Sequence, residues 1–192
     1  AMSEPKQIAT LPPIEELRRD VPRSKRTGEP PRPVVVGVAS ALLYLAVASA
    51  IVAYGWHWWL AADMETYQRS AWLIEWTKPE PGLWLSLALE GALAAALALA
   101  AGAAGVAGFQ AWNGWRWSRW AGLVAVALMG GFAAITSWWA IAPAALTVVG
   151  AVLLFLPPVT KYFRHWAQLR AERPVPYRRP DEIHYGRLPR FR

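Results

Sequence analysis

The sequence predicts an all-α polytopic membrane protein with four transmembrane helices, an outer amphipathic loop and extended cytoplasmic tails. Residues 83–111 are almost all Leu, Ala and Gly, and Glu90 is the only charged residue among them. A helix of roughly 20 apolar residues already crosses a bilayer, so this run is a membrane span. Three further apolar runs, and the gathering of Lys and Arg toward both ends of the chain, support the same class.

The apolar runs divide the chain into three parts. We expect a cytoplasmic basic tail at residues 1–33 and a transmembrane domain at residues 34–163. An interfacial helix and a second cytoplasmic basic tail should follow at residues 164–192. The predicted spans cover about residues 34–60, 83–111, 120–140 and 143–163.

Two features modify this simple pattern of spans. Residues 64–76, in the outer loop, place Tyr and Trp mostly on one side, which favours a helix that lies on the membrane or caps the bundle. Pro157 and Pro158 supply no backbone donors and should kink the last span near its inner end.

The charges predict the orientation of the chain. Of the 20 Lys and Arg residues, seven precede residue 34 and nine follow residue 160. Two lie in the outer loop and two in the inner loop. By the positive-inside rule, both termini should lie in the cytoplasm.

The composition argues against an enzyme. The chain has no Cys, which removes disulfides, thiolate metal sites and CxxC oxidoreductases. It also lacks the HExxH and GxSxG motifs and a second acid within the predicted spans. His57 lies beside a Trp cluster, and we interpret it as an interfacial histidine, because His165 and His184 are predicted on the opposite side of the membrane. We therefore predict no catalytic residues, no cofactor and no metal site.

Glu90 is the main candidate for a functional residue. It lies about 10 Å inside its predicted helix, where a carboxylate costs several kcal/mol unless it is protonated, paired or hydrated. The predicted intramembrane polar site consists of Glu90, Ser86, Thr136 and Ser137. Ser86 lies one turn from Glu90, and the two hydroxyls of the third span lie at a similar outer depth. A base on a neighbouring subunit is the alternative partner.

The second predicted span is also the richest in small residues. Gly91, Ala94, Ala95, Ala98 and Gly102 provide faces on which another helix backbone can approach closely. We therefore expect this span to face other helices, either in the same chain or in a partner.

The two tails are predicted to bind anionic lipids or a partner protein. The basic residues favour contact with anionic headgroups, whereas the spaced aromatic residues of the second tail favour a protein partner. Binding of nucleic acid is disfavoured. The predicted partner-binding or lipid-binding residues are Arg18, Arg19, Arg23, Arg26, Arg164, Arg178, Arg179, Tyr185, Arg187 and Phe191.

The inner loop carries the motif WNGWRWSRW at residues 112–120, followed by an Ala, Gly and Val span. This combination resembles the short inner turn of small four-span integral membrane proteins from high-GC actinobacteria, in particular accessory subunits. The resemblance implies a bacterial origin. Smooth helix faces, an outer amphipathic loop and two inner tails are typical of an accessory or stabilising subunit in a bacterial inner-membrane assembly, and its partners would be larger integral membrane proteins. Its candidate assemblies are an Mce-type lipid transporter and a respiratory supercomplex.

Four spans with one buried glutamate also resemble small multidrug-resistance transporters. That resemblance implies that Glu90 could serve as a proton and cation site in a small proton-coupled transporter. The chain departs from that pattern, because Glu90 lies in the second span and the basic tails are long.

Overall fold

The computed structural model describes residues 21–24 and 27–171. This part of the chain is helical and contains no strand, so the chain is an all-helical polytopic membrane protein as predicted. The bundle consists of α2 (Val34–Ala61), α4 (Trp84–Trp112), α5 (Ser118–Ile135) and α6 (Ile141–Leu153). The shorter elements are η1 (Tyr67–Arg69), α3 (Trp72–Thr77) and η2 (Trp138–Ala140), and α7 (Pro157–Ala171) follows the bundle.

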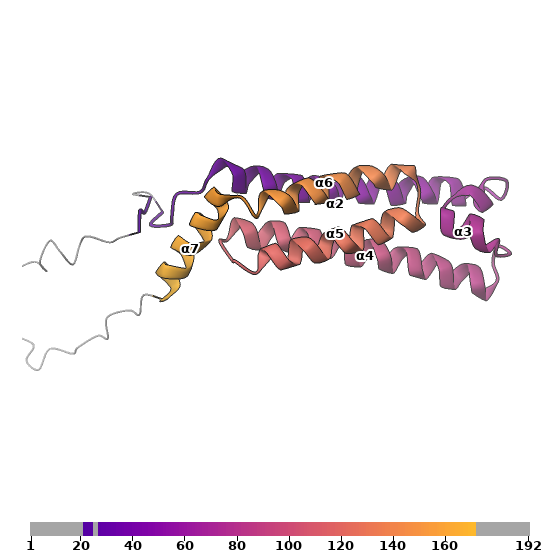
Figure 1. Cartoon of the computed structure of the whole chain (residues 1–192). Helices are drawn as coiled ribbons and strands as arrows, with labels where there is room; N and C mark the ends of the chain where they lie inside the picture. Colours follow the sequence, from indigo (N-terminus) through magenta and orange to yellow (C-terminus); the bar gives the residue numbers. More distant parts are fainter. Residues whose placement is uncertain (1–20, 25–26, 172–192) are drawn as a thin grey trace, which may run out of the picture.

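The four bundle helices form a closed ring of neighbours. In Figure 1, α2 lies beside α6 and α4 lies beside α5. The two pairs pack on each other through contacts of α2 with α4 and of α5 with α6. Helices α2, α4 and α5 are each long and apolar enough to cross a membrane, and the bent pair of α6 and α7 provides a fourth crossing if it is one span.

Small side chains form most of the interior of the bundle. One buried cluster is made largely of alanines from α2, α4 and α5, together with Met129 and Phe132 of α5. Close contacts surround Leu43: a Cβ added at Gly150 would lie 3.0 Å from its Cγ, and one added at Gly108 would lie 3.3 Å from its Cβ. Ser40 Oγ donates a hydrogen bond to the Gly108 carbonyl at 3.0 Å. Small residues therefore let the backbones of α2, α4 and α6 approach one another.

The third helix ends before the end of the predicted span 120–140. Helix α5 stops at Ile135, and Thr136 leaves the helical conformation with φ −99° and ψ −81°. The Thr136 carbonyl accepts the Trp72 backbone N–H at 3.0 Å, which links this position to the start of α3. The chain is extended at Ser137 and resumes helical structure in η2 and α6.

The last predicted span, 143–163, is divided into two helices. Helix α6 ends at Leu153, and α7 starts at Pro157, where a proline in the first turn loses no helical hydrogen bond. The two helices meet at 64°. The two prolines thus separate α6 from a helix that lies across the end of the bundle (Figure 1).

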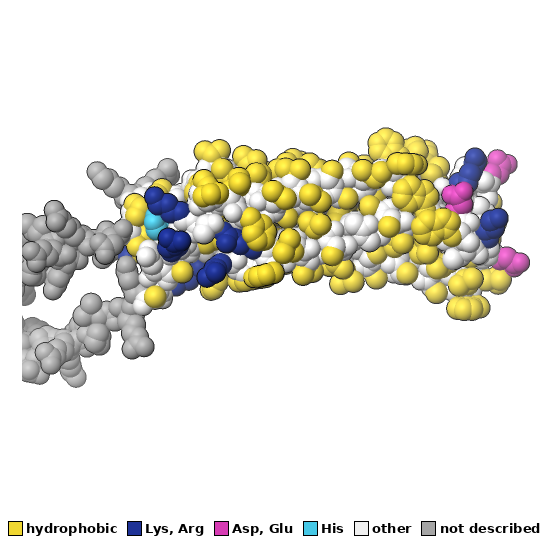
Figure 2. Space-filling view, viewed as in Figure 1, with side chains coloured by type: hydrophobic (Ala, Val, Ile, Leu, Met, Phe, Trp, Pro, Cys, Tyr) yellow, Lys and Arg dark blue, Asp and Glu magenta, His cyan; other side chains and the backbone are white. Residues whose placement is uncertain are grey.

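Charged side chains gather at the two ends of the bundle, and its sides are mainly apolar (Figure 2). We call one end the basic end, which carries Arg32, Arg116, Arg119, Lys161, Arg164 and Arg170. We call the other end the loop end, which consists of residues 62–83 and 136–140. Exposed tryptophans lie at both ends, as expected where a membrane meets water.

The predicted outer loop is partly folded at the loop end. It forms η1 and α3, and its residues Tyr67, Ala71 and Ile74 pack with Leu93 of α4 in one buried cluster. The loop therefore covers the space between α2 and α4.

Candidate functional site

A histidine and a glutamate meet between α2 and α4 at the loop end. The last turns of α2 carry His57, and the second turn of α4 carries Glu90. His57 Nε2 lies 2.8 Å from Glu90 Oε2. The His57 side chain has no exposed surface, and the Glu90 side chain is 16% exposed. We call these two residues the His57–Glu90 pair.

The outer loop fixes the other side of the imidazole. His57 Nδ1 lies 3.1 Å from the Ser70 carbonyl oxygen, which can only accept a hydrogen bond, so Nδ1 carries a hydrogen. One further proton is then shared between Nε2 and Oε2, as an imidazolium with a carboxylate or as a neutral imidazole with a carboxylic acid. Both arrangements have no net charge, so the pair can be buried among apolar side chains at moderate cost.

Aromatic and apolar residues enclose the pair. The Tyr54 ring lies 5.8 Å from the His57 ring, and Tyr67 belongs to the neighbouring buried cluster with Leu93. Burial raises the pKa of the Tyr67 phenol, an effect that Ser86 partly offsets and a negative charge on Glu90 reinforces. The phenol therefore remains protonated at neutral pH.

The hydroxyls that were predicted to accompany Glu90 form no hydrogen bond with it. Ser86 Oγ donates to the Leu83 carbonyl at 2.9 Å and accepts from the Gly82 N–H at 3.1 Å. Thr136 Oγ1 donates to the Phe132 carbonyl at 2.7 Å. Ser137 Oγ is buried and forms no hydrogen bond with the residues that the structure describes. Glu90 itself pairs with His57, which was not included in the predicted polar site.

The interpretation of His57 as an interfacial residue did not include the burial of its side chain. The side chain faces the interior, where it bonds both α4 and the outer loop, although the neighbouring Trp58 and Trp59 are exposed. One signal in the sequence pointed to this pair. His57 and Glu90 lie at similar distances from the loop that joins two adjacent spans, so an antiparallel pairing of those spans places them at a similar depth.

The pair does not extend to a metal site within residues 21–24 and 27–171. No group of three or more His, Cys, Asp or Glu side chains lies close enough there to hold a metal ion. Chemically, the pair can hold or transfer one proton, and it links α2, α4 and the outer loop.

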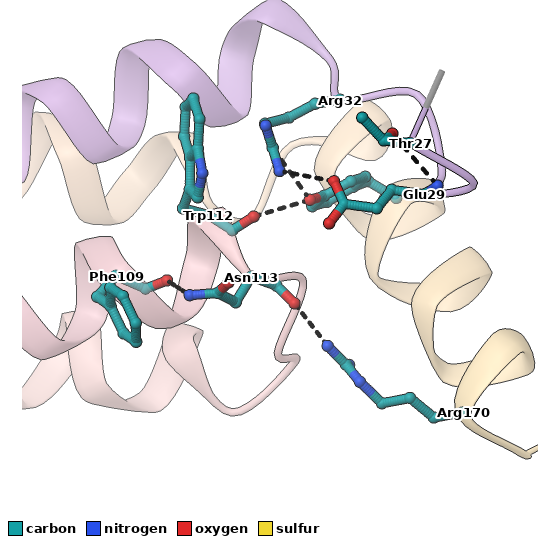
Figure 3. Close-up of polar contacts among 8 residues, drawn as sticks. Thr27, Glu29, Arg32, Phe109, Trp112, Asn113 and Arg170 are labelled. Atoms are coloured by element: carbon teal, nitrogen blue, oxygen red, sulfur yellow. Dashed lines mark hydrogen bonds and ion pairs between the residues drawn. The ribbon is translucent and has the colours of Figure 1, made fainter. Parts of the chain in front are cut away.

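A second group of polar contacts holds the basic end together (Figure 3). The Arg32 guanidinium lies 4.0 Å from the Trp112 ring centroid, donates to Tyr162 Oη at 3.4 Å and pairs with Glu29 at 3.4 Å. Tyr162 Oη in turn donates to the Trp112 carbonyl at 2.8 Å. The segment before α2, the end of α4 and α7 are therefore joined at this end.

Arg170 fixes the far end of α7 to the inner loop. Its guanidinium donates to the Asn113 carbonyl at 2.5 Å and to the Gly114 carbonyl at 3.0 Å. It also lies 3.9 Å from the Trp115 ring centroid and 4.7 Å from that of Trp166. The WNGWRWSRW motif thus provides the aromatic and carbonyl surface on which α7 rests.

Two of the ten predicted partner-binding or lipid-binding residues fall in the described part of the chain. Arg23 is half-buried in the segment before α2, and Arg164 is exposed on α7. The other eight lie outside the described residues, namely Arg18, Arg19, Arg26, Arg178, Arg179, Tyr185, Arg187 and Phe191.

Comparisons with known proteins do not assign the chain to a family. No protein-family model, no curated protein and no solved structure matches it.

Proposed function

We propose that this protein is a non-catalytic accessory or stabilising subunit of a larger complex in a bacterial inner membrane, with both termini in the cytoplasm. One observation carries the proposal. Helix α4 presents Gly91, Ala95, Ala98 and Gly102 at helical spacing, and all four are exposed. A Cβ added at Gly91 or Gly102 would meet no atom within 4 Å.

Such a face suits contact with another helix better than contact with lipid. In membranes, helices associate where small residues let their backbones approach, because packing and not hydrophobic burial drives the association. The same kind of surface is already used inside the bundle at Gly108, which lies against α2. We call Gly91, Ala95, Ala98 and Gly102 the open face of α4 and infer that a helix of a larger membrane protein covers it.

The partner complex is a further part of the proposal. The inner-loop resemblance supports an actinobacterial Mce-type lipid transporter or a respiratory supercomplex. The first of these would give the protein a role in lipid transport, as a subunit that stabilises the assembly without acting on the lipid.

Large residues on the open face should remove the partners. We expect Gly91→Leu with Gly102→Leu to lower the recovery of co-purified membrane proteins roughly tenfold, which corresponds to about 1.4 kcal/mol of binding free energy. The measurement is a pull-down of the tagged protein from its native membrane in a gentle detergent, quantified by mass spectrometry.

The matched control is Gly130→Leu with Gly131→Leu on α5, where added side chains also meet no atom within 4 Å. The control should keep its partners, and both variants should melt near the wild-type temperature. Full recovery of partners with the Gly91 and Gly102 variant would show that the open face of α4 is not the docking surface.

A small proton-coupled transporter that uses Glu90 is the second candidate, and the His57–Glu90 pair favours it. Two titratable side chains meet there within the bundle, as proton transfer requires. Glu90 Oε1 is buried and accepts no hydrogen bond from the residues that the structure describes, so it could accept one from a transported group.

The transporter candidate predicts that Glu90→Gln abolishes a pH-driven flux of a lipophilic dye cation in proteoliposomes, because the amide cannot exchange a proton at neutral pH. Glu75→Gln is the control, since Glu75 is an exposed acid on α3. An unaltered flux in Glu90→Gln, or no flux with the wild-type protein, would remove this candidate.

A further inference from the structure

Two adjoining hollows lie at the basic end, where α7 follows α6. The smaller has a volume of about 180 Å³ and is lined mainly by Arg116, Arg119, Thr160, Phe163 and Arg164. The larger has a volume of about 570 Å³, and its lining includes Phe155, Lys161, Arg164 and His165. Thr160 and Arg164 line both hollows. Cationic side chains from α5, α7 and the inner loop therefore converge on one place.

Among the residues that the structure describes, the segments that line these hollows carry no acid. Residues 91–171 contain five Lys and Arg residues and no Asp or Glu. In the part of the chain that the structure describes, the acid at this end is Glu29, and it pairs with Arg32. Several like charges close together favour binding of an anion, because each raises the local positive potential.

One guanidinium is held in place before any ligand binds. Arg119 Nε donates to the Leu154 carbonyl at 2.9 Å, and its Nη2 donates to Thr160 Oγ1 at 2.6 Å. Its guanidinium carbon also lies 5.5 Å from the Phe155 ring centroid and 5.2 Å from that of Phe163. Arg119 thus forms a fixed wall of the smaller hollow, whereas Arg116 and Arg164 are exposed and can reach toward a ligand.

One side of the larger hollow is apolar. Phe155 lines it and is 46% exposed, and Val152, one turn earlier on α6, is 58% exposed. These side chains lead from the cationic hollows onto the apolar side of the bundle. A ligand that fits both parts must carry an anionic group and a hydrocarbon chain.

We propose that the two hollows bind the phosphate of an anionic phospholipid, with an acyl chain lying along Phe155 and Val152. The planar guanidinium of arginine presents paired N–H donors that match the oxygens of a phosphate and bind it with short, charge-assisted hydrogen bonds. The location of the hollows at the end of the membrane helices also suits a lipid, because basic pockets beside membrane helices recognise lipid headgroups. This site uses other residues than the open face of α4, so it does not rest on the proposed function.

The test is a titration of the full-length, delipidated protein in detergent with phosphatidylglycerol, followed by native mass spectrometry. Arg116→Gln with Arg164→Gln removes two charges from the hollows and leaves the contacts of Arg119 and Thr160 unchanged. We expect this variant to bind phosphatidylglycerol at least about tenfold more weakly than the wild type. The matched control, Arg69→Gln with Lys78→Gln, removes the same charge from the exposed surface of the loop end and should change the affinity less than about twofold.

Two parallel titrations identify the source of the phosphate. Phosphatidylcholine, which carries a phosphate but no net charge, should bind more weakly than phosphatidylglycerol, and inorganic phosphate should not compete at millimolar concentration. Equal weakening by both pairs of substitutions would overturn the site, since charge alone would then explain the binding. Equal affinity for the two lipids would also overturn it, and competition by inorganic phosphate would replace the lipid with a free anion.

Discussion

Glu90→Leu is expected to lower the free energy of unfolding by about 3 kcal/mol, because it leaves His57 buried with no partner for Nε2. His57→Leu should cost a similar amount, since the Glu90 carboxylate would then have to be protonated or hydrated inside the bundle. The readout is thermal unfolding in detergent micelles, followed by tryptophan fluorescence.

The double replacement, His57→Leu with Glu90→Leu, tests whether the two residues stabilise the protein as a pair. Leucine is similar in size to both side chains, and an apolar pair often replaces a buried ion pair at little cost. We therefore expect the double variant to be more stable than either single variant. If the two losses simply added, the residues would not act as a pair, and the interpretation of this site would fail.

Gly114→Ala is expected to release α7 from the inner loop. Gly114 has a φ of +71°, which favours glycine, and an added Cβ would collide with the Trp166 indole. Trp166 is held there beneath Arg170, so the collision should disturb the whole contact between α7 and the inner loop. The expected cost is about 2 kcal/mol.

Hydrogen exchange measures this effect at the helix concerned. Amides of residues 157–171 should exchange faster in Gly114→Ala, while those of α2 and α4 remain protected. Gly130→Ala is the control: it lies within α5 in open space, and alanine should leave the stability unchanged or slightly higher. Unchanged exchange in α7 with the Gly114 variant would mean that this contact does not hold the helix.

The sequence was sufficient to predict the fold class, because apolar length alone identifies a span. It was not sufficient to predict which sides of the spans face inward. Both α2 and α4 are apolar all round, so no polar stripe marks their outer faces. In α2, small residues such as Ala46 and Ala53 are buried, while Ile51 and Val52 are exposed. This arrangement is the reverse of a soluble core, and it follows from packing between helices in lipid.

The candidate site was only partly predictable for the same reason. The cost of burying a carboxylate identified Glu90 from sequence alone, but its partner depends on how α2 is rotated against α4. The hydroxyls of Ser86 and Thr136 lay within plausible reach, yet both bond to nearby backbone groups. The end of α5 at Ile135 could not be predicted from the sequence either. It involves the Thr136 carbonyl, which accepts a hydrogen bond from the Trp72 N–H, and Trp72 lies far from Thr136 in the sequence.

The most direct test of the proposal that this protein is an accessory subunit starts with purification of the tagged wild-type protein from its native membrane in a gentle detergent. The mass of the intact purified particle is then measured. We predict a stoichiometric complex with larger integral membrane proteins, whose identities would name the process that the protein serves. A protein that is recovered alone, or only as a homodimer, would contradict the proposal and turn attention to transport at the His57–Glu90 pair.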